Sequence, residues 1–156
     1  MKHCFALLLL LLVGTRAPAK EPIPLRAGPL TMVFDADNAM LRYLRVGKSE
    51  VLLGINSPVR DQFWGTVIPK VTNVKVADGG DKFTVSFDAS CREREIDFAW
   101  KGRIVGDTSG QVVFTFDGEA RSTFMRNRIG FCILHGPSAA GQRWIIEDTN
   151  GAKAPG

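Results

Sequence analysis

Apolar and polar residues alternate along most of the chain, in short runs that end at turn residues. Residues 83–88 read FTVSFD and residues 96–101 read IDFAWK, so every second side chain is apolar. A period of two is typical of a β-strand with one buried face. Between residues 28 and 146 no stretch keeps the 3.6-residue spacing of an amphipathic helix. The pattern therefore predicts strands throughout this part of the chain.

Turn residues divide the alternating stretches into roughly ten strands, spaced about 8–15 residues apart. The clearest turn is Asp78-Gly79-Gly80-Asp81, because glycine supplies the positive φ that a tight hairpin needs. Asp117-Gly118 is interpreted as another turn, and Leu41 and Tyr43 are expected on one side of a strand. This spacing predicts an all-β fold, an antiparallel β-sandwich that stands alone or belongs to a larger supersandwich. With no repeat or linker, residues 20–156 are expected to form one domain.

Two later segments carry specific expectations. Residues 129–134 form a nearly continuous apolar run, which is typical of a central strand buried on both faces, with Phe131 in the core. Residues 143–147 are predicted as the last strand, followed by Asn150-Gly151, a strong hairpin signal. Few residues follow that turn, so this strand is expected to be an edge or to lack its partner. A frayed tail is the alternative.

The N-terminus has the pattern of a targeting signal. Residues 5–13 read FALLLLLLV, which makes about 14 Å of helix, whereas a bilayer core of roughly 30 Å needs about 20 residues. Lys2 precedes this run and Ala17-Pro18-Ala19 follows it. The pattern predicts a secretory signal peptide at residues 1–19 that is removed before Lys20, and so a periplasmic or extracellular chain. A buried apolar helix or a membrane anchor is the alternative.

Removing that leader changes the charge. The 20 basic residues lose Lys2 and Arg16, so 18 − 16 leaves a net charge of +2, with no clustered basic face. Nucleic acid is therefore not an expected partner, and no membrane span is expected. Cys91 and Cys132 could form a disulfide after export, or stay as buried thiols. His135 is the only histidine left, so no metal site and no cofactor are expected.

Candidate binding residues gather in residues 124–136. Arg126, Asn127, Arg128 and His135 provide planar donors and an amide, the groups that recognise a carboxylate or a sugar. Residues at i and i+2 of a strand share a face, so the two arginines could grip one carboxylate together. The alternative is structural, with both arginines paired to acids of this chain such as Asp117 or Glu119.

A second candidate set consists of Arg60, Asp61 and Trp64, where an exposed indole ring could serve as a platform for a sugar. The alternative is that Trp64 belongs to the core. His135 as a general base would need an orienting carboxylate and a nucleophile or water within reach. The chain has no G-x-S-x-G motif, which excludes an α/β-hydrolase nucleophile.

The chain resembles the N-terminal β-domain of the D-apionate lactonase family over residues 25–150. The similar stretches are PLRAGPLT at 24–31, LRYLRVGKSEVL at 41–52, VRDQFWGTVIP at 59–69, IDFAWKGRIVG at 96–106 and, most specifically, FDGEARSTFMRNRIGFCILHG at 116–136. Such enzymes continue into a TIM-barrel-like domain and a C-terminal β-domain, and they hydrolyse a sugar-acid lactone in apiose breakdown. One departure is that Gly136 separates His135 from Pro137, where the family pattern continues His-Pro.

The resemblance implies a stand-alone, non-catalytic β-domain that binds a carbohydrate or sugar acid, or packs against a partner chain or a missing downstream domain. Export is expected from the leader alone, since members of this family are typically cytoplasmic. No catalytic residue of the family is carried over to this β-domain, so the catalytic residues stay open, and the resemblance places the partner of the last strand beyond Gly156. One alternative is a part of a lactone hydrolase that works with a separate or missing catalytic barrel. Another is a truncated, inactive gene product.

Overall fold

The computed structural model describes residues 20–143 and 145–155, and the expected leader lies outside them. The strands are β1 (Ile23–Ala27), β2 (Leu30–Asp35), β3 (Met40–Val46), β4 (Ser49–Asn56), β5 (Val59–Asp61), β6 (Thr66–Val67), β7 (Lys70–Asp78), β8 (Phe83–Glu93), β9 (Ile96–Gly106), β10 (Val112–Ala120), β11 (Arg126–Ile129), β12 (Cys132–Leu134), β13 (Ile145–Glu147) and β14 (Lys153–Pro155). A single 3₁₀ turn, η1 (Pro137–Ala139), is the helical part of this region. None of the helices among the described residues is long and apolar enough to cross a membrane.

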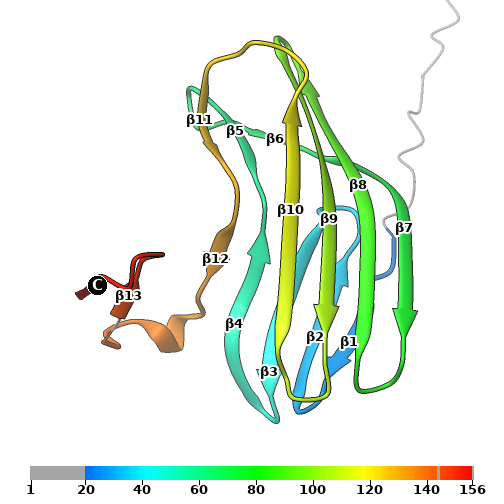
Figure 1. Ribbon diagram of the computed structural model, residues 1–156, viewed down its shortest axis with the longest axis vertical. Coiled ribbons are helices and arrows are strands. Elements are labelled where there is room, and N and C mark those ends of the chain that lie inside the picture. Colours follow the sequence, from blue (N-terminus) through cyan, green and yellow to red (C-terminus); the bar gives the residue numbers. More distant parts are fainter. Residues whose placement is uncertain (1–19, 144, 156) are drawn as a thin grey trace, which may run out of the picture.

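Two antiparallel sheets form the body of the molecule (Figure 1). One has the strand order β1-β2-β3-β4-β12 and the other the order β10-β9-β8-β7. A small sheet, β11-β5-β6, lies at one end, and β13 and β14 form a separate ribbon. The prediction of an all-β antiparallel sandwich is confirmed.

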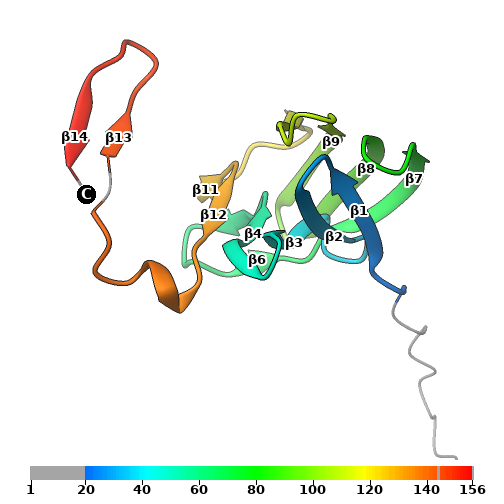
Figure 2. The same ribbon diagram turned by 90° about the horizontal axis from the view of Figure 1, so that it is seen from below.

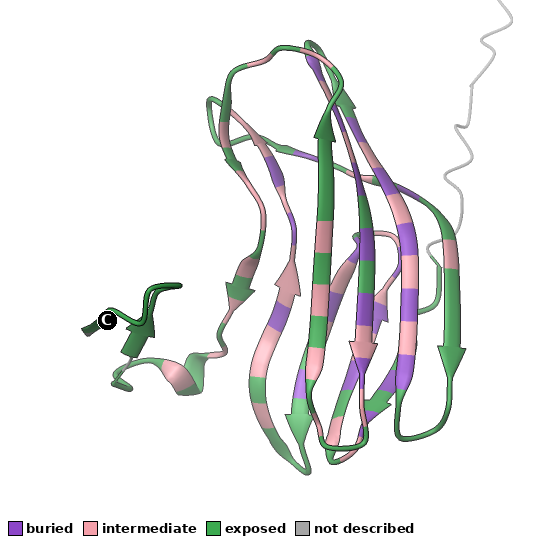
Figure 3. Cartoon of the chain, in the orientation of Figure 1, coloured by how far each residue is buried: buried purple, intermediate pink, exposed green. Residues whose placement is uncertain are grey.

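The core lies between the two larger sheets because each strand turns every second side chain inward (Figure 3). Phe34 of the five-stranded sheet contacts Phe87 of the four-stranded sheet, with ring centroids 5.2 Å apart. Trp100 stands edge-on to Phe87 at 5.1 Å. Buried aromatic pairs of this kind contribute about 0.5–1.5 kcal/mol beyond the burial of their area. The alternation predicted for residues 83–88 and 96–101 is confirmed.

The Asp78–Asp81 segment forms the predicted hairpin between β7 and β8. Asp78 lies opposite Phe83, and Gly80 has a φ of +87°. The Asp78 carboxylate accepts a hydrogen bond from the Gly80 amide at 2.8 Å. This hairpin was predictable because the turn chemistry is local.

Asp117-Gly118 is not a turn, and that prediction is wrong. Both residues lie inside β10, with Asp117 opposite Lys101 and Gly118 opposite Trp100. A Cβ atom on Gly118 would lie 2.5 Å from the Phe98 ring. The same close approach occurs at Gly102, whose missing Cβ would overlap the Phe87 ring on the neighbouring strand. These glycines lie in strands because aromatic rings fill the space of their side chains.

Tyr43 does not share the buried face of Leu41, contrary to the expectation. Tyr43 has a φ of +55° and is 38% exposed, and the pairing of β3 with β4 shifts its register just after it. The irregularity turns Leu44 into the core in place of Tyr43. A β-bulge of this kind moves every later side chain to the opposite face.

Residues 129–134 do not form a central strand, and that prediction is also wrong. Gly130, with a φ of +134°, separates β11, which pairs with β5, from β12, which pairs with β4. β12 is the edge of the five-stranded sheet, and Phe131 and Ile133 are each 47% exposed. The apolar run changes partners at Gly130 instead of entering the core.

The last predicted strand has its partner inside the chain. Ile145 lies opposite Pro155 and Glu147 opposite Lys153, so the expectation of a missing partner strand is wrong. The Asp148 carboxylate accepts hydrogen bonds from the amides of Asn150 at 2.8 Å and Ala152 at 2.9 Å, which closes the turn. The ribbon stands apart from the sandwich (Figure 2).

Candidate functional site

The two candidate sets of the sequence lie next to each other in the fold. β11 pairs with β5, which places Arg126 opposite Asp61 and Ile129 opposite Val59. β5 in turn pairs with β6, and residues 62–65 connect these two short strands. One small sheet therefore carries both the arginines of β11 and the loop that contains Trp64.

A cavity of about 280 Å³ opens beside β11, and we call it the arginine cavity. Its lining consists of Pro58, Arg60, Arg126, Asn127, Arg128, Ile129, Gly130, Phe131 and Cys132. Three arginines and one asparagine thus line a space whose lining contains no carboxylate. Such a set favours an anion with planar oxygen acceptors.

The arginines of the cavity do not pair with acids of this chain in the part that the structure describes. None of the ion pairs there includes Arg60, Arg126 or Arg128. Glu119 approaches Arg121 instead, at 3.9 Å. The expected structural alternative, in which Asp117 or Glu119 neutralises the β11 arginines, is not what the structure contains.

Trp64 lies at the surface beside these arginines. Its side chain is 53% exposed, so the alternative of a core tryptophan is wrong. The guanidinium carbons of Arg128 and Arg60 lie 5.1 Å and 5.7 Å from the centre of its ring. Both distances are within the range of cation–π attraction, which contributes about 0.5–1 kcal/mol at an exposed site. The ring therefore helps to hold two arginines in the absence of a carboxylate.

Asp61 shapes the loop and does not line the cavity. Its carboxylate accepts hydrogen bonds from the amides of Phe63 at 2.8 Å and Gly65 at 2.7 Å. Its backbone carbonyl accepts another from the Trp64 amide at 3.2 Å. These bonds fix a tight turn in which Trp64 has a φ of +72°. Asp61 is thus a positioning residue for the indole ring.

Arg60 retains an unused donor. Its Nε atom is buried and has no hydrogen-bond partner within the described segments. Buried polar groups are nearly always hydrogen-bonded, so an orphan donor in a cavity wall is a place where a ligand oxygen would be stabilised. Arg60, Arg126 and Arg128 form the basic part of the site, and Asn127 adds an amide.

His135 is not brought to the arginine cavity. It follows β12 at the surface and is absent from the cavity lining. The lining also lacks the carboxylate that would orient a catalytic histidine. Across residues 20–143 and 145–155, no group of three or more His, Cys, Asp and Glu side chains could hold a metal ion.

Sequence reasoning missed Phe131 as a wall of the cavity because it assigned this ring to the core. The ring contacts Phe114 edge-on at 5.0 Å while nearly half of it stays exposed. Gly130, directly before it, was the available signal, since glycine inside a strand pattern often marks a change of direction.

Cys91 and Cys132 are free thiols, and the disulfide considered above is not formed. Cys91 is 1% exposed in β8. Burial raises the pKa of the Cys91 thiol to about 11, and the neighbouring Trp100 side chain partly offsets that increase. Cys132 is half-buried and lies in the wall of the arginine cavity.

Fold and site define an antiparallel β-sandwich domain with a cationic, carboxylate-free cavity beside an exposed indole ring. Residues 10–156 match the family described as "D-apionate lactonase, N-terminal domain". The curated D-apionate lactonase of Brucella anthropi is 34% identical over 127 residues, which are 80% of this chain and 20% of that enzyme. The chain therefore belongs to the D-apionate lactonase N-terminal domain family, and it spans about a fifth of the length of this relative. No solved structure matches it.

Proposed function

We propose that this domain binds a sugar acid in the arginine cavity and that it has no catalytic activity of its own. The observation that carries the proposal is the lining, in which Arg60, Arg126 and Arg128 surround one space without a carboxylate. Two guanidinium groups can bind both oxygens of a ligand carboxylate through paired hydrogen bonds. The relative's name, a lactonase of D-apionate, points to the same class of ligand.

The remaining walls favour a sugar acid over a small inorganic anion. Phe131 in the lining and Trp64 next to the arginines present apolar surface beside the cations, and the C–H face of a sugar packs on such surface. The amide of Asn127 both donates and accepts, so it can read the direction of a hydroxyl group. A volume of about 280 Å³ is small for a ligand site and suits one monosaccharide unit.

Lactone hydrolysis needs a group that activates water or a nucleophile. The lining of the arginine cavity contains neither a histidine nor a carboxylate to act as a general base. We therefore assign recognition to this domain. Hydrolysis would come from another polypeptide segment, as in the alternative of a lactone hydrolase with a separate catalytic barrel.

The test is calorimetric titration of the full chain with D-apionate. Arg126→Ala with Arg128→Ala should weaken binding by about tenfold or more, because each charge-assisted hydrogen bond contributes about 1.5–3 kcal/mol. Arg103→Ala with Arg143→Ala removes the same charge outside the cavity and should leave the affinity unchanged. Equal losses in both double variants, or no binding by the parent chain, would contradict the proposal and favour an inactive product.

A second candidate function is packing against another polypeptide, and the ribbon favours it. Ile145 and Ile146 are consecutive residues of β13, so they face opposite sides of the ribbon, yet they are 71% and 63% exposed. A two-stranded ribbon is marginally stable alone, so a covering surface would stabilise it. Sedimentation with the separately expressed remainder of the Brucella anthropi enzyme should show a complex that Ile145→Asn with Ile146→Asn weakens. Sugar-acid affinity should not change in that variant.

We also propose that the chain is exported after cleavage behind Ala19. The support is the apolar run at residues 5–13 followed by small residues at positions 17 and 19. N-terminal sequencing of exported protein should begin at Lys20. Recovery of the chain with Met1 intact from the cytoplasm would contradict this proposal.

A further inference from the structure

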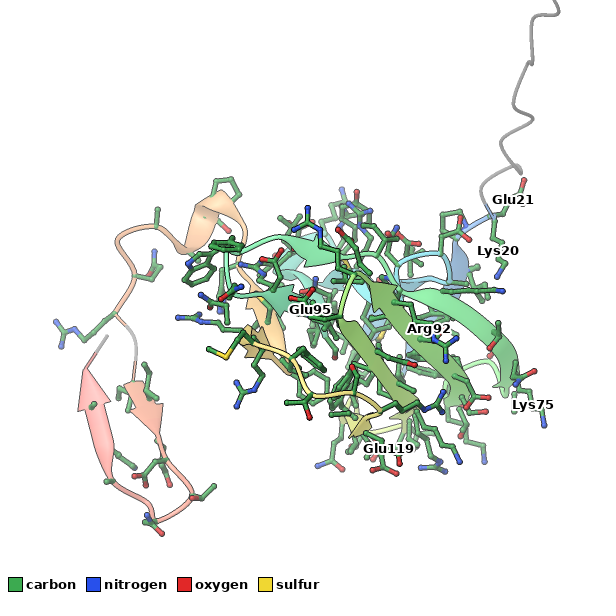
Figure 4. All side chains as sticks on the ribbon, turned by 90° about the horizontal axis from the view of Figure 1, so that it is seen from above. Lys20, Glu21, Lys75, Arg92, Glu95 and Glu119 are labelled. Atoms are coloured by element: carbon green, nitrogen blue, oxygen red, sulfur yellow. The ribbon has the colours of Figure 1, made fainter. Side chains whose placement is uncertain are left out.

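A second hollow, of about 570 Å³, lies on the outer face of the four-stranded sheet. Its lining shares no residue with the arginine cavity. The outer face of β8, β9 and β10 carries the polar side chains that alternate with the buried ones, and Figure 4 shows Glu119 projecting among charged groups on this side. We call this feature the outer hollow.

The hollow exists because small residues meet in the middle of the sheet. Ser90 lies opposite Ala99, so the outward side chains of β8 and β9 are short at this point, and Glu119 of β10 lies on the other side of Ala99. Longer side chains of Lys101, Glu119 and Arg121 stand around this floor. Short side chains in register on adjacent strands leave a depression in the surface of the sheet.

Donors and acceptors alternate around the rim. Asp88, Lys101 and Asp117 lie in one cross-strand row, because Lys101 faces Asp88 on β8 and Asp117 on β10. Within the described residues, Lys101 forms no ion pair with either carboxylate, and Asp117 accepts no hydrogen bond from a side chain. Asp88 accepts a hydrogen bond from the Asn73 amide at 2.7 Å. The ammonium of Lys101 and the carboxylate of Asp117 are therefore available to a ligand.

The mixture of charges selects the class of ligand. An anion would meet the carboxylates of Asp88, Asp117 and Glu119, and a cation would meet Lys101 and Arg121. A neutral polyol avoids both repulsions, since each hydroxyl group can donate to a carboxylate and accept from an ammonium. The hydroxyl groups of Thr72 and Ser90 add further partners of the same kind.

We propose that the outer hollow is a binding site for a neutral sugar, separate from the sugar-acid site. Recognition there depends on hydrogen bonds to charged groups, which are stronger than those between neutral groups. The inference does not depend on the function proposed for the arginine cavity. The two sites would accept different ligands, one neutral and the other carrying a carboxylate.

D-xylose and its aldonate, D-xylonate, serve as the neutral and the anionic probe for NMR titration of the full chain. D-xylose should shift the amide signals of residues 88–90, 99–101 and 117–119. Ala99→Leu fills the floor without changing charge and should abolish these shifts. Thr115→Leu, an outward substitution on the same sheet but outside the hollow, should leave them intact.

Asp117→Asn provides a second variant that adds no bulk, and it should weaken D-xylose binding in a chain with unchanged folding. Shifts that persist in Ala99→Leu, or D-xylose shifts confined to residues 126–131, would overturn the proposal. A parent chain that shows no shifts with D-xylose would overturn it as well. D-xylonate should act at residues 126–131, so failure of one site is distinguishable from failure of the other.

Discussion

Trp64 has a backbone conformation that L-residues with side chains rarely adopt. Its φ of +72° brings Cβ close to the following carbonyl, which costs about 1–2 kcal/mol. The bonds from the Asp61 carboxylate to the Phe63 and Gly65 amides hold this conformation. Strained residues of this kind occur where a side chain must be presented in one direction. Here the direction places the indole ring beside Arg60 and Arg128.

Replacing Trp64 by glycine should weaken ligand binding and leave the stability of the fold almost unchanged. Trp64→Gly relieves the strain and loses two exposed cation–π contacts, so the free energy of unfolding should change by less than about 1 kcal/mol. D-apionate binding should weaken, because the apolar platform is gone and the arginines lose their support. Thermal melting and calorimetry measure the two effects. A large loss of stability with intact binding would show that Trp64 serves the fold.

The two cysteines should differ in reactivity. With a thiol pKa raised to about 11, Cys91 has little thiolate at pH 8 and is also buried, so iodoacetamide should label Cys132 first. Mass spectrometry of each peptide reports the order, and Cys132→Ser should leave the slow labelling of Cys91 unchanged. Because the pKa of Cys91 is raised in the folded state, the buried protonated thiol contributes fully to the stability of the fold below pH 9. This contribution is lost as the pH rises towards 11. Rapid labelling of Cys91 in the folded chain would contradict its buried placement.

The glycines within an apolar run indicate the course of a strand better than the length of the run does. Alternation alone located β8 and β9 because their pairing is regular over eleven residues each. It failed at Tyr43 and Gly130, where a positive φ reverses which face a residue occupies. Such reversals depend on partner strands that are distant in sequence, so the local pattern does not contain them.

Replacing Phe131 and Phe87 by alanine should cost different amounts of stability, because one ring lies at a sheet edge and the other in the core. Phe87→Ala removes a ring that is 3% exposed and touches Phe34 and Trp100, and it should cost about 3–5 kcal/mol. Phe131→Ala removes a half-exposed ring and should cost roughly 1–2 kcal/mol. Denaturant unfolding of both variants measures the difference between their free energies of unfolding. Equal costs would place Phe131 in the core after all.

The β7–β8 hairpin offers a matched pair of glycines. Gly80→Val forces a β-branched residue to a φ of +87° and should cost about 1 kcal/mol or more. Gly79 lies outside the left-handed region, and a Cβ there would lie 3.1 Å from the Lys82 side chain and 3.3 Å from its carbonyl oxygen, so Gly79→Val should cost less because it adds no strain in φ. Melting temperatures that fall equally in both variants would contradict this account of the turn.

For the molecule as a whole, the sequence was sufficient to predict the sandwich and to name half of the residues of the candidate site. Alternation and turn spacing predicted two antiparallel layers, since burying one face of each strand has few other solutions. Arg126, Asn127 and Arg128 were predicted as a set because they are adjacent in sequence. They lie next to Arg60 and Trp64 because β11 pairs with β5, and no local sequence pattern reveals this pairing. The outer hollow depends in the same way on cross-strand register.

The ribbon should be dispensable for the stability of the sandwich. β13 and β14 pair with each other and with no strand of the two larger sheets. Deleting residues 141–156 should therefore leave the melting temperature and D-apionate affinity unchanged. Scanning calorimetry of the shortened chain checks this expectation. A clear drop in melting temperature would show that the ribbon braces the sandwich in solution.

The pairing of rings with glycines across strands limits which sequences this domain can accept. Phe87 occupies the space of a side chain at Gly102, and Phe98 does so at Gly118. A larger residue at either glycine clashes, and a smaller residue at either ring leaves a void, so single replacements are unfavourable in both directions. Divergent relatives should therefore exchange the two members together. In a family alignment, positions 87 and 102 should covary, as should positions 98 and 118. This covariation would identify the domain in relatives whose overall sequence identity is low.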